Sequence, residues 1–135
     1  MDYDEAVEVI HATNQPLIKE FQTWLQAQGL RPKTIKSHLD NVHFFAEYLV
    51  YVEPLRLLEQ ADAHDVYDFL SNWFPRKAAW ACVSNTQSYL ATFRKYFTFL
   101  QQTGRINDTL RAEVNLTLKE DKEEFLDAVA DDEGY

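Results

Sequence analysis

Histidine and carboxylate side chains are the groups in this sequence that could bind a metal ion or transfer protons. His38 and His43 are five residues apart, a spacing that puts them on different faces of a helix. The other candidates fall on one short, solvent-exposed segment and would form at best a partial ligand set; they are Asp62, His64, Asp65 and Asp68. Nothing around them indicates a catalytic pocket. The sequence therefore predicts no catalytic residue, no metal site and no cofactor.

Basic residues gather where a long helix, Lys33–Val52, is expected to begin. Lys33, Lys36 and Ser37 lie near its start, and Arg31 comes just before it. Cations at this end oppose the helix dipole, so they do not stabilise the helix itself. The unpaired N–H groups of a first turn bind anions. We therefore expect phosphate to bind here; the alternative is a solvated basic turn with no partner.

The net charge of −9 is unevenly distributed along the 135 residues. Residues 1–16 carry four acids and no Lys or Arg, and residues 106–135 carry ten acids and three bases. The middle, residues 17–105, carries ten bases and eight acids. Because phosphate binding depends on Lys and Arg, only this middle part is compatible with a nucleic-acid partner.

The segment Ser84–Ile106 is expected to be the main core helix. Its apolar stripe follows the three- and four-residue helical spacing and consists of Leu90, Phe93, Tyr96, Phe97 and Leu100. Ser84 and Gln87 have the spacing of a capping box, and Gly104 is placed to end the helix. The opposite face is polar and flat near its start, so another macromolecule could approach it closely.

Three glycines, four prolines and long helical periodicities predict an all-α fold in one domain. Besides the two helices above, we expect helices at residues 3–11, 16–28 and 63–74, bounded by Asn14, Gly29 and Pro75. Asp62 and Asp65 have capping spacing for the last of these. Leu57, Leu58 and Trp80 are expected in the core, whereas Phe44, Tyr51 and Phe99 lie off the main stripes and are candidate partner contacts.

The C-terminal part, residues 107–129, has apolar residues that could form one face of a further helix: Leu110, Val114, Leu118, Phe125, Leu126 and Val129. We expect the preceding helices to stay folded without it, and its acidic side chains could compete with DNA for the basic face. Asp131–Tyr135 is expected to be disordered. The single Cys82 excludes an internal disulfide, and the acidic N-terminus resembles neither a signal peptide nor a membrane span. A cytoplasmic location fits.

Three blocks of sequence resemble the N-terminal core-binding domain of tyrosine recombinases and phage integrases. The first is Leu30–Lys36 with the following Val42, Phe45, Tyr48 and Leu49; the second is Leu58–Val66 with Phe69 and Leu70; the third is Leu90–Leu100 with Gly104 and Ile106. The resemblance implies a four-helix, SAM-like domain over residues 16–106, with a short N-terminal helix in an acidic extension, residues 1–15. Residues 107–135 would be an acidic, partly helical C-terminal extension or the start of a linker.

The same resemblance implies a module that clamps double-stranded DNA. Because the family's catalytic domain would follow Tyr135, the resemblance also implies that this module performs no catalysis itself. Other recombinase protomers are possible partners; no membrane and no small-molecule substrate are implied. The implied DNA contacts are Arg31, Lys33, Thr34, Lys36, Ser37, Arg76, Lys77, Gln87, Ser88, Arg94 and Lys95. The sequence departs from the family at Ser88 and Tyr89, where a basic pair is common, and at Asp40, where arginine is usual. The competing hypothesis is a protein-interaction domain that keeps the fold without binding DNA.

Overall fold

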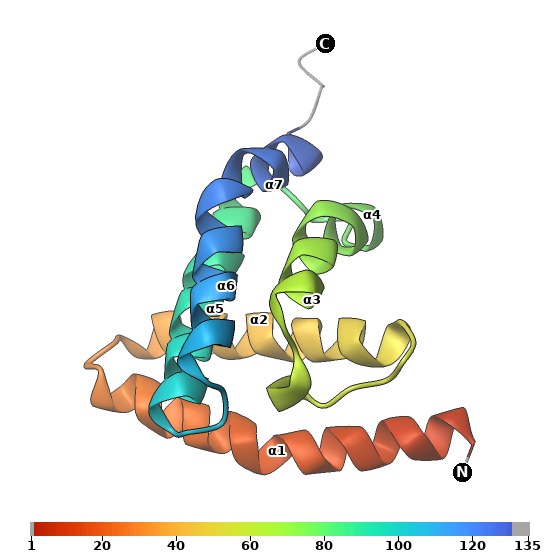
Figure 1. The fold of residues 1–135 in the computed structure, drawn as a ribbon, viewed down its shortest axis with the longest axis vertical. Coiled ribbons are helices and arrows are strands. Elements are labelled where there is room, and N and C mark those ends of the chain that lie inside the picture. Colours follow the sequence, from red (N-terminus) through yellow and green to blue (C-terminus); the bar gives the residue numbers. More distant parts are fainter. Residues whose placement is uncertain (1, 131–135) are drawn as a thin grey trace. The chain divides into compact units, whose positions relative to one another are not determined.

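The computed structural model describes residues 2–130, and within this range the fold is all-α, with no β-strand, as predicted. The chain divides into two compact units, Met1–Ala61 and Asp62–Tyr135. The first unit contains the helices α1 (Tyr3–Ala27) and α2 (Pro32–Tyr51) and the 3₁₀ turn η1 (Leu58–Gln60). The second contains α3 (Ala63–Asp68), the π-helical turn η2 (Phe69–Trp73), α4 (Phe74–Lys77), α5 (Val83–Gln102), α6 (Asp108–Glu120) and α7 (Lys122–Val129) (Figure 1).

In the first unit, α1 and α2 form an antiparallel helical hairpin (Figure 1). The turn between them contains Gly29 at φ +77°, a left-handed conformation that suits glycine, so its predicted role as helix terminator is confirmed. The apolar stripes of both helices are buried as the periodicity predicts, with Leu17, Ile18, Phe21 and Leu25 on α1 and Val42, Phe45, Tyr48 and Leu49 on α2. Leu58 of η1 is also fully buried.

The predicted interruption at Asn14 is wrong, because α1 is one continuous helix that runs through Pro16. The buried Asn14 accepts a hydrogen bond on Oδ1 from the backbone N–H of Leu58, at 3.0 Å. At the start of α1, the Tyr3 hydroxyl donates to the carbonyl oxygen of Val50 at 2.7 Å. Pro16 removes one hydrogen bond to the carbonyl of Ala12, but Ala12 is exposed and water can replace that bond. These long-range contacts outweigh the local cost of proline.

Replacing Asn14 with alanine is expected to destabilise the first unit by about 1–3 kcal/mol, because the buried N–H of Leu58 loses its acceptor. The measurement is urea unfolding. Thr13→Ala is the matched control, since the exposed Thr13 hydroxyl bonds only locally, to the carbonyl of Val9. Equal unfolding midpoints for the two variants would contradict the role given to Asn14.

The second unit begins with a confirmed helix cap and a helix that is longer than predicted. Asp62 accepts from the N–H of Asp65, and Asp65 accepts from the N–H of Asp62, forming the capping box of α3. The predicted stop at Pro75 is wrong, because the chain widens into the π turn η2 and then starts α4 with Pro75 in the first turn. Proline has no N–H to pair there, so a new first turn accommodates it.

The centre of this unit is a cluster of aromatic rings contributed by η2, α4 and α5. The Phe69 ring lies 5.1 Å from Tyr89, 5.6 Å from Phe74 and 5.9 Å from Phe93, measured between centroids. The predicted stripe of α5 is buried throughout. Phe99 is buried as well, so the interpretation of Phe99 as a partner contact is wrong. Trp80 was expected in the core, but 55% of its surface is exposed.

The start of α5 also differs from the prediction. The helix begins at Val83 with Cys82 as its N-cap, so the capping box expected from Ser84 and Gln87 does not form within the described residues. The Ser84 hydroxyl instead lies 3.3 Å from the Cys82 sulfur. Gly104, at φ +76°, follows the helix end as predicted.

The C-terminal segment forms two helices, α6 and α7, that are packed into the second unit. Val114, Leu118 and Phe125 are fully buried, and α6 and α7 contact α5, α3 and η2. The Tyr67 hydroxyl donates to Glu124 Oε2 at 2.5 Å, a bond that raises the pKa of Tyr67. These contacts make α6 and α7 part of the core of this unit, so we no longer expect the preceding helices of the unit to stay folded without them. Asp131–Tyr135, expected to be disordered, lies outside the described residues.

Candidate nucleic-acid interface

The first group of predicted contact residues lies at the start of α2. Arg31, Lys33, Thr34, Lys36 and Ser37 are all exposed. Arg31 is the N-cap, Pro32 occupies the first turn, and among the described residues no side chain caps this end of α2. The first N–H groups of the helix therefore lack a side-chain acceptor and point to where an anion would bind.

Lys36 has a carboxylate partner in this structure. Its Nζ lies 2.7 Å from Asp40 Oδ2, one helical turn further along α2, and both side chains are exposed. An exposed pair of this kind contributes little to stability. The carboxylate nevertheless offsets the positive charge that Lys36 would present to a phosphate.

Charge is strongly polarised along the α1–α2 hairpin. No Asp or Glu occurs in residues 21–39, which form the turn end of the hairpin and include Arg31, Lys33 and Lys36. The opposite end of the hairpin carries acids from both helices. Asp2, Asp4, Glu5 and Glu8 lie at the start of α1, and Glu47 and Glu53 lie near the end of α2 or just after it. The basic residues are thus concentrated at one end of this unit.

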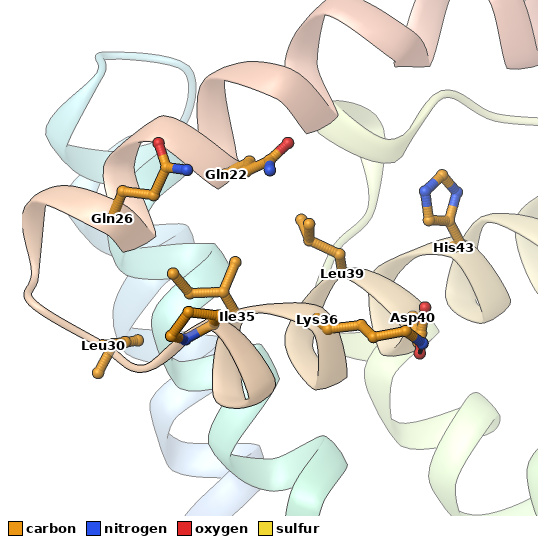
Figure 2. A pocket seen from close by; sticks show the side chains of 9 residues that line it. Gln22, Gln26, Leu30, Ile35, Lys36, Leu39, Asp40 and His43 are labelled. Carbon is orange, nitrogen blue, oxygen red and sulfur yellow. Dashed lines mark hydrogen bonds and ion pairs between the residues drawn. The ribbon is translucent and has the colours of Figure 1, made fainter.

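A groove of about 480 Å³ lies between α1 and α2 at the same end (Figure 2). Gln22 and Gln26 line it from α1, and Ile35, Leu39 and His43 line it from α2. The Lys36–Asp40 pair lies at its edge. Its lining mixes apolar side chains, the two glutamine amides and the ionisable side chains of Lys36, Asp40 and His43.

The second group of predicted contact residues lies on α4 and α5. Arg76, Lys77, Gln87 and Arg94 are exposed, while Ser88 and Lys95 are half-buried. This group falls in the longest acid-free part of the chain, residues 69–107, which contains five Lys or Arg residues and no Asp or Glu. On α5, Gln87, Arg94 and Lys95 share one side of the helix by their spacing. The second unit therefore presents its own basic surface.

Part of this side of α5 is occupied by α6. The Arg111 guanidinium donates to the carbonyl of Arg94 at 3.3 Å and also to the hydroxyl of Thr98. Partial burial lowers the pKa of Arg111. The sequence analysis did not predict this contact between α5 and α6. The accessible part of the face is thus its N-terminal half, near Gln87 and Ser88.

Within residues 2–130, the N-terminus of α5, like those of α4 and α7, has no side-chain cap hydrogen bond. Its N-cap is Cys82, whose sulfur is only a weak acceptor and, in the described part of the chain, makes no regular cap hydrogen bond with the first N–H groups. The Cys82 thiol donates to Asn85 Oδ1 at 2.9 Å. Hydrogen bonding from Ser84, and then from the backbone of Asn85, lowers the pKa of this exposed thiol. By contrast, α1, α3 and α6 begin with the capping residues Asp2, Asp62 and Asn107.

Two other kinds of feature, a metal centre and a membrane span, can be assessed within residues 2–130. No group of three or more His, Cys, Asp or Glu side chains could hold a metal ion in that range. His38 is buried and His43 is exposed, so the two diverge as the helical spacing predicts. None of the helices in that range has the length and apolar character needed to cross a membrane.

Comparison with known proteins gives one family. The chain matches the family model described as phage integrase, N-terminal SAM-like domain, over residues 18–104. The match includes both basic groups and ends just after α5. No curated protein and no solved structure matches the chain significantly.

Proposed function

Since the chain belongs to the family of phage integrase N-terminal SAM-like domains, we propose that it is the duplex-DNA-binding module of a tyrosine recombinase or integrase, acting in the cytoplasm. In this proposal it holds DNA through its backbone phosphates and takes no part in strand cleavage or transfer. Its partners would be double-stranded DNA and other recombinase protomers.

The observation that carries the proposal is where the cations lie in an otherwise acidic chain. Two acid-free stretches, residues 21–39 and 69–107, hold eight of the 13 Lys and Arg residues and none of the 22 acids. Each stretch contains a helix that starts without a side-chain cap, within the described residues. Exposed Arg31 and Lys33 lie at the start of α2, and exposed Arg76 and Lys77 precede α5 in the chain. Exposed cations beside unpaired helical N–H groups form a phosphate-binding arrangement.

The affinity expected from this arrangement is modest. Few cations are available, Lys36 is paired with Asp40, and the net charge of −9 repels DNA at a distance. We expect binding near the non-specific range of roughly 10⁻⁴–10⁻⁶ M at physiological salt, and much tighter binding at low salt.

The test is a salt series of DNA-binding titrations with the double variant Lys33→Ala, Arg76→Ala. Both residues are exposed, and one belongs to each basic group. Losing two phosphate contacts should reduce the slope of log K against log salt by about 1.8. The matched control is Lys19→Ala with Lys119→Ala, which removes two exposed cations outside both groups and should leave the slope nearly unchanged.

Two outcomes would count against the proposal. Equal slopes for the two double variants would mean that net charge, not these surfaces, determines binding. Absence of salt-dependent DNA binding by the unmodified chain at low salt would favour a protein-interaction domain that keeps the family fold.

A further inference from the structure

Trp80 lies in a tight turn between α4 and α5. The turn is closed by a hydrogen bond from the N–H of Ala81 to the carbonyl of Ala78, at 3.1 Å. Ala78 is buried, and its N–H bonds to the carbonyl of Phe74, also at 3.1 Å, which fixes the turn to the end of α4. The other residues of the turn are alanines, whose side chains are too short to cover an indole ring. As a result, 55% of Trp80 is exposed.

Burial in the second unit accounts for only part of this placement, because more than half of the Trp80 surface stays exposed. A buried tryptophan removes about 150–250 Å² of surface from water, and an exposed one leaves much of that stabilisation unused. Trp24 and Trp73 are each less exposed than Trp80. Tryptophan is among the residue types that are enriched at contact surfaces.

The electrostatic surroundings of Trp80 indicate which partner fits. Arg76 and Lys77, both exposed, form the last turn of α4 directly before the tryptophan turn. The uncapped start of α5 follows directly after it. No acid occurs within ten residues of Trp80 on either side. The cations and the uncapped helix start favour a polyanionic partner, and the exposed indole ring favours a partner with flat, apolar faces. DNA has both properties.

We infer that Trp80 packs its indole ring against a base or a deoxyribose of bound DNA while Arg76 and Lys77 hold neighbouring phosphates. This inference rests on the proposed function and adds a contact that is not electrostatic. Three residues of chain span at most about 10 Å, so Lys77 and Trp80 reach adjacent nucleotides of one strand. The ring contributes apolar and stacking contacts, which any base or sugar can accept.

A contact of this kind is separable from phosphate binding by its salt dependence. Phosphate contacts release counterions and therefore set the slope of affinity against salt, whereas stacking releases none. Removing the indole ring should lower the affinity at every salt concentration by a constant factor. Removing Arg76 or Lys77 should change the slope.

The experiment compares Trp80→Ala, Trp80→Phe and the unmodified chain in DNA-binding titrations over a salt series. Trp80→Ala should bind roughly 5- to 150-fold more weakly with an unchanged slope, as expected for one lost stacking contact. Trp80→Phe keeps an aromatic ring and should recover part of the affinity. Leu116→Ala is the control: Leu116 is 54% exposed but lies outside the acid-free stretches, so its loss should leave DNA binding unchanged.

Tryptophan fluorescence provides an independent measurement on the same proteins. The difference between the unmodified chain and Trp80→Phe isolates the emission of Trp80, and DNA should quench it. Repeating the titrations with a single strand of the same sequence locates the contact. A larger loss for Trp80→Ala on the single strand identifies stacking on an unpaired base, and equal losses identify contact with the deoxyribose edge.

The outcomes separate this inference from the proposed function. If the unmodified chain binds DNA and Trp80→Ala binds equally well, the inference is wrong while the proposed function stands. A reduced salt slope in Trp80→Ala would also overturn it, since the ring would then act only by positioning the cations. Unchanged Trp80 emission with DNA, together with concentration-dependent self-association lost in Trp80→Ala, would assign the ring to a protein contact.

Discussion

Ending the chain after Ile106 is expected to unfold residues 62–106. The truncation removes α6 and α7, and with them Val114, Leu118, Phe125 and Val129, which are all buried in the second unit. Full burial of one such side chain is worth about 1.5–3 kcal/mol. The loss of four therefore approaches the total stability of an ordinary domain, about 5–15 kcal/mol. Far-ultraviolet circular dichroism should show helix loss well beyond the deleted residues.

A chain ending at Ala130 is the control for this truncation, because it keeps every described helix and should unfold like the unmodified protein. Cooperative unfolding of residues 1–106 with an unchanged urea midpoint would show that α6 and α7 are dispensable. The packing also means that this truncation does not isolate the effect of acidic charge on DNA binding. Competition between the acidic segment and DNA stays a prediction.

Replacing Phe69 with alanine is expected to destabilise the second unit by about 3–5 kcal/mol. Phe69 is fully buried, and its ring contacts the rings of Phe74, Tyr89 and Phe93. The substitution leaves a cavity that these rings cannot fill without breaking their own edge and stacking contacts. In urea unfolding the midpoint should fall while the dependence on denaturant stays the same.

The control for Phe69→Ala is Leu116→Ala, which shortens an apolar side chain that is 54% exposed on α6. It should change the free energy of unfolding by less than about 0.5 kcal/mol, as is usual for surface positions. A loss at Phe69 no larger than the loss at Leu116 would contradict the central role of the aromatic cluster.

The helical class and the buried stripes were predictable because they depend on local periodicity. The stripe from Leu90 to Leu100 and the terminators Gly29 and Gly104 follow directly from side-chain spacing and backbone freedom. The errors arose where a distant contact overrides a local rule. The hydrogen bond from Leu58 to Asn14 keeps α1 continuous near Pro16, and a π turn lets the chain pass Pro75.

The exposure of the candidate contact residues was predictable to a similar extent, while their role in binding stays a prediction. Charge and helical spacing placed Lys33, Arg76 and Gln87 on the surface, and the structure has them exposed. Two contacts could not be established from spacing alone: the ion pair between Lys36 and Asp40, and the hydrogen bond from Arg111 to the backbone of α5. Trp80 was assigned to the core because tryptophan usually is, and only the turn geometry shows otherwise.

The uneven charge of the α1–α2 hairpin has a kinetic consequence. A body with cations at one end and acids at the other has an electric dipole moment along its length, and an external field exerts a torque on this dipole. Near a polyanion, that torque turns the end containing Arg31 and Lys33 forward before any contact forms. The negative net charge slows the approach of the protein to a polyanion, while the dipole favours orientations in which the basic end of the hairpin faces the polyanion. Added salt shortens the range over which this orientation acts.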